Sequence, residues 1–205
     1  QEENIAVLGR VMISEQIPRS LFTRVHLDAS YNAFDGKTEL GWKGFVTCNL
    51  SVKTSFLMAH ELFEESMRVL HEDMELGERL SHHGLRIFYR PEALGHHYHY
   101  IDEKTFLDSA KQEAKSLVAW YKKSPHLAKE LSSLGFSLTM PPARRIGHFF
   151  GDIFINSYTR PLLLEVARRL SSINEKLALR LYVKIYQAIK RETIRKELGV
   201  KAFTG

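Results

Sequence analysis

The spacing of apolar residues changes near residue 102, and this change divides the chain into two parts. Before it, short apolar runs bounded by glycine, proline and asparagine are typical of buried strands with loops between them. After it, apolar residues recur every three or four positions, which is the repeat of a helix that buries one face. The pattern predicts an α/β first part, residues 1–101, and a mainly α-helical C-terminal region, residues 102–205.

Three apolar runs in the first part predict strands, at residues 5–9, 45–48 and 85–89. The second run ends at Asn49 and the third is closed by Pro91, after which a further strand-like piece follows. Residues 14–44 mix polar and turn-forming residues, so we expect loops there with one short helix.

Two helices are expected between these strands. Residues 54–60 form the first, with Thr54 or Ser55 as its cap. Residues 72–82 form the second, because leucines recur four positions apart, acidic residues fill the first turn and Gly84 follows the end.

The second part predicts a series of helices, over residues 106–121, 125–134 and 162–198. Pro125 stops the first of them, and Pro141 with Pro142 interrupts the pattern after the second. A capping box at residues 172–175 divides the third stretch into two helices.

Composition places the chain among ordinary globular proteins. Its 205 residues are 44% hydrophobic and 26% charged, and no run approaches the roughly 20 apolar residues of a membrane span. Cys48 is the single cysteine, so an internal disulfide is excluded and a reducing compartment is the simpler interpretation. We therefore expect a cytoplasmic location.

The two parts carry opposite charge. Residues 1–102 have 10 Lys/Arg against 15 Asp/Glu, a net −5, whereas residues 103–205 have 19 against 9, a net +10. A basic part is attracted to anionic lipid or nucleic acid, but a solvated helical surface explains the same composition. We expect no nucleic acid and keep a membrane surface as a candidate partner, bound through Lys184, Lys190, Arg191, Arg195 and Lys196.

Glu72 and Asp73 are the candidate catalytic residues. Two carboxylates at a helix start lie beside unpaired backbone N–H groups and the positive end of the helix dipole. This setting favours ionised carboxylates, which accept a hydrogen bond from a hydroxyl and act as general bases. Acidic first turns also simply stabilise helices, so the pair alone does not decide between the two roles.

Three histidines within four residues, His96, His97 and His99, form the second candidate site. Neutral imidazole is a common metal ligand, and alternate residues such as His97 and His99 point the same way on a strand. Nothing nearby supplies the Cys/His pairs of a structural zinc site, and a surface strand end is the alternative interpretation. No glycine-rich phosphate loop, Gly-x-Ser-x-Gly motif or Asp-x-Asp pair occurs in the chain.

The order of motifs in the first part resembles the second half of family 2 glycosyltransferases of the GT-A fold. In that family a strand ending in Asn-x-Ser precedes a Phe-Asp-Glu turn and a Glu-Asp-x-Glu-Leu-x-x-Arg-Leu helix. A Gly-x-x-Ile-x-Tyr-x-Pro-x-Ala strand and a histidine close the block. The matching segments are residues 44–51, 62–65, 72–80 and 84–93, followed by His97. One departure is that residues 63–65 are Phe-Glu-Glu.

The resemblance implies α/β architecture, a partial GT-A-type mixed sheet, and a defined reaction. Asp73 matches the aspartate that deprotonates the acceptor hydroxyl, which then attacks the anomeric carbon of a nucleotide-sugar donor with inversion. Glu72 matches its neighbour, which positions the acceptor.

Metal and acceptor contacts are also implied by the resemblance. His97 matches a ligand of a divalent metal, Mg²⁺ or Mn²⁺, and His99 and His96 are the fallbacks. Thr47 and Asn49 border the acceptor pocket, although a capped strand end is an equal alternative. The acceptor is expected to be a carbohydrate or lipid-linked molecule of polysaccharide or cell-envelope biosynthesis, met in the cytoplasm or at the inner face of the membrane.

In the family, a nucleotide-binding half with an Asp-x-Asp motif precedes these segments, and the strand at residues 5–9 resembles one that follows that half. We therefore expect this chain to be inactive alone and to form homo-oligomers through an exposed sheet edge. Two other functions stay open. One is a non-catalytic glycosyltransferase remnant that binds a partner chain or membrane, and the other is a metal hydrolase built on the histidines.

Overall fold

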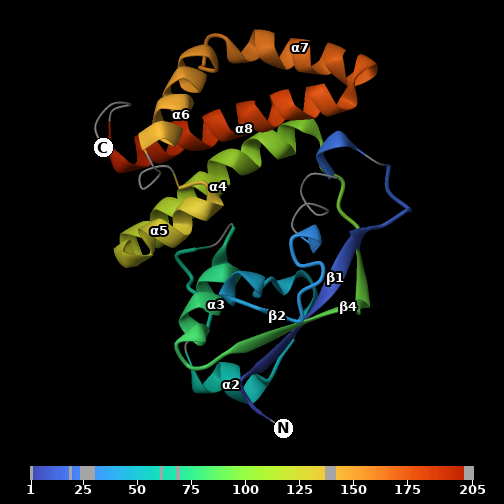
Figure 1. Cartoon of the computed structure of the whole chain (residues 1–205), viewed down its shortest axis with the longest axis vertical. Coiled ribbons are helices and arrows are strands. Elements are labelled where there is room, and N and C mark those ends of the chain that lie inside the picture. Colours follow the sequence, from blue (N-terminus) through green and yellow to red (C-terminus); the bar gives the residue numbers. More distant parts are fainter. Residues whose placement is uncertain are drawn as a thin grey trace. The chain divides into compact units, whose positions relative to one another are not determined.

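In the computed structural model the chain is a mixed α/β protein with two compact units, Gln1–Asp102 and Glu103–Gly205 (Figure 1). The structure describes residues 2–18, 20–23, 31–60, 62–67, 70–136 and 142–200, and for residues 142–145 the backbone alone. The boundary between the units falls where the apolar spacing changes its period.

Unit 1 is built on a four-stranded mixed sheet with the order β2-β4-β1-β3 (Figure 1). Its strands are β1 (Ile5–Ile13), β2 (Glu39–Leu40), β3 (Leu50–Val52) and β4 (Arg86–His97). The long strands β1 and β4 are parallel neighbours, and each short outer strand runs antiparallel to the one beside it. Residues 10–13 of β1 pair with β4 alone among the described strands, so this end of the sheet has open edges.

Helices of unit 1 pack on the sheet through apolar residues. They are α2 (Thr54–Ala59) and α3 (Glu72–Ser81), with 3₁₀ turns η1 (Trp42–Gly44) and η2 (Thr47–Asn49). Leu76 and Leu80 lie one turn apart on α3 and are buried in one core with Phe56, Leu8 and Ile87. Helical residues also occur at 21–23 and 31–32, in the stretch where loops and one short helix were expected.

The expected strand at residues 45–48 is wrong. Residues 45 and 46 belong to no helix or strand, η2 follows, and the strand begins only at Leu50. Phe45 is buried with 1% exposure, and a Cβ added at Gly77 of α3 would lie 2.3 Å from the Phe45 Cβ. The apolar character of this segment therefore reflects packing against α3 and not strand pairing.

Strand β4 continues through Pro91, where the sequence predicted its end. Proline has no N–H, and the register with β1 shifts before Arg10, so residues 91–93 have no partner on β1. The side-chain amide of Asn49 donates hydrogen bonds to the carbonyl of Arg10 (3.1 Å) and to that of Ala93 (2.9 Å). Asn49 thus ties the two strands together at the irregularity.

Helix ends in unit 1 follow the sequence signals unevenly. Helix α3 begins at Glu72 as predicted, and Gly84 beyond its end has a left-handed backbone with φ of 79°. Helix α2 has Lys53 as its N-cap instead of Thr54 or Ser55, and Lys53 makes no side-chain cap bond.

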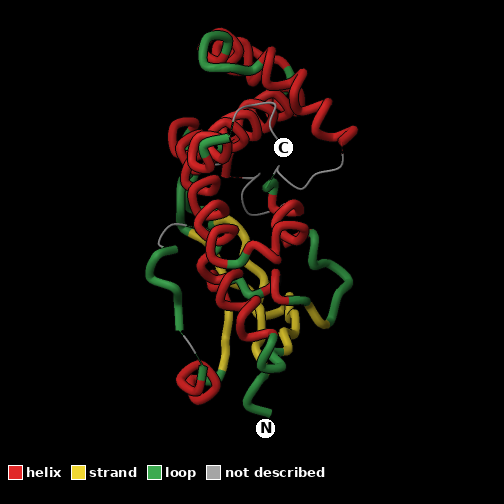
Figure 2. Tube along the Cα trace, turned by 90° about the vertical axis from the view of Figure 1, so that its left-hand side faces the viewer, coloured by secondary structure: helices red, strands yellow, loops and turns green. Residues whose placement is uncertain are grey.

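Unit 2 is helical, and none of its described residues is assigned to a strand (Figure 2). Its elements are α4 (Glu103–Lys123), η3 (Pro125–Leu127), α5 (Ala128–Leu131), η4 (Ser132–Leu134), α6 (Pro142–Phe154), α7 (Arg160–Ile173) and α8 (Glu175–Leu198). Helix α8 packs against α4, α7 and α6. Ala110 of α4 and Ile185 and Ile189 of α8 are buried together in this core.

Most helices of unit 2 were predicted, including the division between α7 and α8. The N-cap of α8 is Asn174, whose side-chain oxygen accepts the N–H of Leu177 at 3.0 Å, and the expected cap Ser172 lies within α7. Helix α6 was missed, because Pro142 was taken as an interruption whereas proline is well suited to a first helical position. Pro141 lies outside the described residues.

Three of the five basic residues expected to face a membrane are held inside unit 2. Lys190 is 2% exposed and its ammonium lies 2.7 Å from the Glu113 carboxylate. Burial lowers the pKa of Lys190, and the charge of Glu113 opposes that shift. Arg191 and Arg195 both bind Asp152, at 2.5 and 2.8 Å. The expectation is corrected: these side chains stabilise helix packing and are not free for lipid.

Gly77→Ala tests the close approach of α3 to residues 42–45. The new Cβ would lie 2.8 Å from the Trp42 carbonyl oxygen as well as against Phe45. We expect the free energy of unfolding to fall by about 1–3 kcal/mol, although alanine is the better helix former by about 1 kcal/mol. Urea denaturation measures this change.

Gly41→Ala is the matched control, because nothing lies within 4 Å of a Cβ at Gly41. Its effect should stay within about 0.5 kcal/mol. Equal stability of the Gly77→Ala variant and the unaltered protein would show that α3 does not pack this closely.

Candidate functional site

The start of α3 is set by an unusual backbone conformation. His71, the N-cap, has φ of 67° and ψ of 7° and makes no side-chain cap bond. A left-handed conformation is uncommon for a residue other than glycine, and such strain occurs often at functional sites. It turns the chain so that Glu72 and Asp73 occupy the first turn of the helix.

Asp73 is held by backbone N–H groups. Its Oδ2 accepts the N–H of Thr47 at 3.1 Å, and its Oδ1 accepts the N–H of Met74 at 2.8 Å. Both oxygens are therefore oriented, and each keeps a lone pair for a further donor. Thr47 contributes its backbone to this contact, and the residue itself is exposed.

Glu72 lies beside Asp73 with an oxygen that has no partner. Its Oε2 is buried and makes no hydrogen bond in the described part of the chain. A buried polar atom without a partner is uncommon in folded proteins, so this oxygen distinguishes Glu72 within its helix. The two other carboxylates of α3 differ, since Glu75 binds Arg79 at 2.9 Å and Glu78 binds His82 at 2.8 Å.

A thiol and two phenols are linked to these carboxylates, directly or through one another, by their electrostatic influence. Cys48 is exposed as a residue, but loss of hydration around its sulfur raises the pKa of the thiol, and the charges of Asp73 and Glu72 raise it further. Burial likewise raises the pKa of Tyr31, with smaller effects from Cys48, Tyr89 and Asp73. Tyr31 and Tyr89 are each 2% exposed, and neither hydroxyl has a hydrogen-bond partner among the described residues. We call these five residues, Tyr31, Cys48, Glu72, Asp73 and Tyr89, the Asp73 cluster.

Asn49 adjoins this cluster in sequence but is used differently. Its amide nitrogen is taken up by the carbonyls of Arg10 and Ala93. A Cβ at Gly9 would come within 2.4 Å of that nitrogen and 2.3 Å of the Ala93 oxygen. Asn49 therefore positions β1 against β4. This contact agrees with the alternative interpretation, in which Asn49 is a structural residue at a strand end.

The histidine cluster lies at the end of β4. The Nδ1 of His97 is buried without a partner, and its ring meets that of His99 edge-on, with 5.8 Å between centroids. Burial lowers the pKa of His97, and the charge of His99 lowers it further, so the neutral, metal-binding form is favoured. His96 is exposed.

These residues fit one part of a metal site. His97 offers an orphaned imidazole nitrogen and His99 is its neighbour, but the described residues contain no group of three His, Cys, Asp or Glu that would hold an ion. His97 also lies eight residues beyond Tyr89 along β4, at roughly 3.3 Å per residue. The structure therefore does not bring His97 and the Asp73 cluster together as parts of one site.

The sequence analysis missed the phenols and the thiol. Tyr31 falls in a stretch without regular spacing, Tyr89 was taken as strand core, and Cys48 carried no recognised motif. No local signal distinguishes them, because their proximity to Asp73 depends on how α3 packs against the sheet.

No family model, no curated protein and no solved structure matches this chain. The fold and site define a mixed α/β unit with a carboxylate cluster at a helix start, together with a helical unit. No helix of the described residues is long and apolar enough to cross a bilayer.

Alkylation of Cys48 tests whether Asp73 is charged beside the thiol. Only the thiolate reacts with iodoacetamide, and a neighbouring negative charge disfavours it. Asp73→Asn removes that charge, so the pKa of Cys48 should fall and alkylation near pH 8 should quicken by about three- to tenfold. Cys48 is the single cysteine, so mass spectrometry follows it without interference.

Glu92→Gln is the control for general charge, because Glu92 is exposed and does not contribute to the raised pKa of Cys48. Its alkylation rate should match that of the unaltered protein. If the alkylation rates of the unaltered protein and of Asp73→Asn had identical pH profiles, Asp73 would not lie near the thiol.

Proposed function

We propose that the first unit is the acceptor-side half of a family 2 inverting glycosyltransferase of the GT-A type, with Asp73 as the general base. The observation that carries the proposal is the setting of Asp73. Its carboxylate is fixed by backbone N–H groups at a helix start, beside a buried Glu72 oxygen without a partner. The order of the motifs from residue 44 to His97 supports the proposed assignment to this family.

The proposed chemistry needs one proton acceptor and one oriented hydroxyl. The acceptor hydroxyl donates a hydrogen bond to Asp73, which takes its proton as the oxygen attacks the anomeric carbon. The bond between that carbon and the donor phosphate breaks, the nucleotide diphosphate leaves with the bonding electron pair, and the configuration inverts. Glu72 accepts a second hydrogen bond from the acceptor and so limits its orientations.

A divalent ion, Mg²⁺ or Mn²⁺, is part of the proposal. His97 would supply one ligand through its orphaned Nδ1, with His99 as the fallback. When bound, such an ion would neutralise the departing diphosphate as a Lewis acid. The substrates proposed are a nucleotide-sugar donor and a carbohydrate or lipid-linked acceptor, used in the cytoplasm.

Asp73→Asn tests the general base. The amide keeps an oxygen for the Thr47 N–H but does not take a proton, so we expect kcat to fall by about 10²- to 10⁴-fold with little change in KM. Sugar transfer from a panel of nucleotide sugars is measured on the longest natural polypeptide that contains this sequence.

Glu175→Gln is the matched control, since Glu175 is an exposed carboxylate in the first turn of another helix, α8. It should retain full activity. Equal rates for Asp73→Asn and Glu175→Gln would mean that Asp73 only stabilises its helix.

His97→Ala tests the proposed metal ligand. Loss of one ligand should raise the Mn²⁺ concentration for half-maximal activity by about tenfold or more. Binding of Mn²⁺ in the presence of a nucleoside diphosphate, followed by electron paramagnetic resonance, should weaken in parallel. His126→Ala is the control, because His126 is an exposed histidine of η3, outside β4 and its histidine cluster. A Mn²⁺ requirement that does not differ between the two variants would exclude His97.

A further inference from the structure

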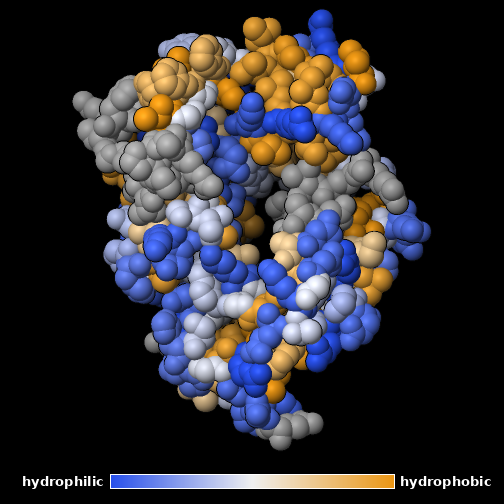
Figure 3. Space-filling view, viewed as in Figure 1, coloured by the Kyte–Doolittle hydropathy of each residue, from blue (hydrophilic) through white to orange (hydrophobic). Residues whose placement is uncertain are grey.

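Helices α6 and α7 present a row of large apolar side chains to solvent. Phe154 is 69% exposed, Tyr158 92% and Leu162 68%. Ile146, Phe150 and Phe154 lie one turn apart on α6, and Leu162 and Ile173 lie three turns apart on α7. Tyr158 lies in the turn between the two helices, and these six exposed residues are here called the α6–α7 apolar face. In Figure 3 orange side chains gather over the helices that Figure 1 labels α6 and α7, with blue side chains at their margin. Exposed apolar groups of this size usually mark an interaction surface.

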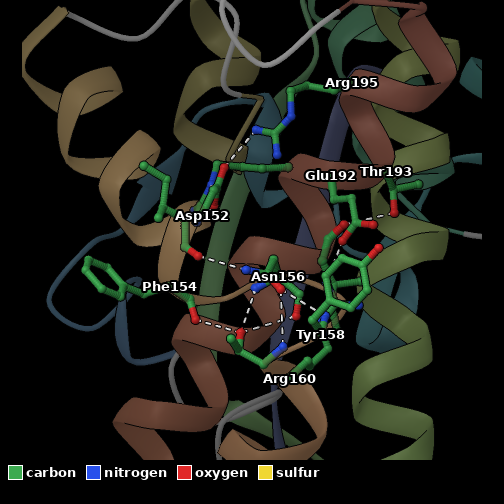
Figure 4. A network of polar contacts seen from close by, with 12 residues as sticks. Asp152, Phe154, Asn156, Tyr158, Arg160, Glu192, Thr193 and Arg195 are labelled. Atoms are coloured by element: carbon green, nitrogen blue, oxygen red, sulfur yellow. Dashed lines mark hydrogen bonds and ion pairs between the residues drawn. The ribbon is translucent and has the colours of Figure 1, made fainter.

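The opposite side of α6 is anchored to α8, which fixes the outward orientation of the apolar face. Asp152 accepts hydrogen bonds from Arg191 (2.5 Å) and from Arg195 (2.8 Å) (Figure 4). Asp152 lies about 200° around the helix from both Phe150 and Phe154, at 100° per residue. Rotation of α6 to bury its aromatic residues would break these buried ion pairs, so the exposed face persists.

The turn between the two helices is also held in place. The side-chain oxygen of Asn156 accepts the N–H of Tyr158 at 2.9 Å and that of Thr159 at 3.2 Å (Figure 4). The Thr159 hydroxyl donates to the carbonyl of Phe154 at 2.7 Å. Tyr158, the most exposed aromatic residue of the row, is thus presented by an ordered turn.

The charge around this face indicates its partner. Residues 142–180 contain seven Lys/Arg and three Asp/Glu, which leaves +4, within a unit of net +10. Arg169, Lys176 and Arg180 are exposed in this stretch, and Arg169 also pairs with Glu165 at 2.9 Å. Exposed aromatic and aliphatic side chains flanked by basic ones are the composition of helices that lie in the interface of an anionic membrane. A second copy is disfavoured, because it would bring two surfaces of net positive charge together.

We propose that the α6–α7 apolar face is the docking surface for an anionic lipid bilayer. Phe150, Phe154 and Leu162 enter the boundary between headgroups and acyl chains, and the basic residues beside them contact lipid phosphates. Tyr158 lies at headgroup level with its hydroxyl in water. The proposal is independent of the chemistry at Asp73, and it replaces Lys190, Arg191 and Arg195, which form ion pairs within unit 2, as the basis of membrane binding.

Cosedimentation of the whole chain with lipid vesicles tests the proposal. We expect binding to vesicles of phosphatidylcholine mixed with phosphatidylglycerol and much weaker binding to phosphatidylcholine alone. Raising NaCl from about 0.1 M to about 0.5 M should reduce binding without abolishing it, since salt screens the charges and spares the apolar contact. Binding that does not depend on lipid charge, or no binding at all, overturns the proposal.

The double substitution Phe154→Ser with Leu162→Ser identifies the face. Because two apolar side chains are lost from the interface, the vesicle partition coefficient should fall by about tenfold or more. Met58→Ser in unit 1 is the matched control, because Met58 is 70% exposed and apolar. Unaltered circular dichroism melts establish that all variants fold. A double variant that binds as tightly as Met58→Ser overturns the assignment.

A fluorescent reporter distinguishes lipid from a second copy of the chain. Phe154→Trp should show a blue shift on vesicles and quenching by brominated lipid, whereas Met58→Trp should show neither. If the chain forms a dimer that the double serine variant abolishes in sedimentation, and no brominated-lipid quenching occurs, the face is covered by a second copy and the membrane proposal is wrong.

Discussion

The close approach of α3 to residues 42–49 is the contact on which the candidate site depends. Gly77 has no side chain, so the helix backbone lies against Phe45 and the Trp42 carbonyl. This approach brings the start of α3 to η2, where the Thr47 N–H reaches the Asp73 carboxylate at 3.1 Å. A larger residue at position 77 would separate the two segments and with them the Asp73 carboxylate from the Thr47 N–H. Packing at the middle of the helix therefore sets the chemistry at its start.

The same contact explains where sequence patterns succeeded and failed in unit 1. Helix α3 was predicted because its leucine spacing, acidic first turn and Gly84 are local signals that agree with one another. The strand expected at residues 45–48 was wrong because burial under α3 and burial in a sheet select the same apolar residues. Strand β4 passes through Pro91 at a register shift where the Asn49 side chain supplies hydrogen bonds from another segment. Local signals contain neither of these tertiary partners.

Charge in unit 2 shows a similar limit. Its net +10 was visible in the sequence, but not which cations are available. Lys190 and Arg191 lie on α8 among apolar residues, and the carboxylates of Glu113 and Asp152, each distant in sequence, hold them inside. The Asp152 pair fixes α6 against α8 and leaves its aromatic side outward. Because Pro142 looked like an interruption, α6 itself was not predicted, and its amphipathic character became evident only with the fold.

Two adjacent carboxylates at a helix start are compatible with a stabilising role and with a catalytic one, and the partners of the neighbouring acids help to separate them. Helix α3 carries four carboxylates. Glu75 and Glu78, further along, are each matched to a basic side chain of the next turn. Among the described residues, Asp73 is matched to backbone N–H groups and the Glu72 oxygen Oε2 to nothing. Binding to backbone N–H groups at a helix start stabilises the helix, and it leaves each Asp73 oxygen a lone pair for a further donor. The Glu72 oxygen without a partner is the feature that a purely stabilising role does not require, and it is the observation behind the proposal that Asp73 acts as a base.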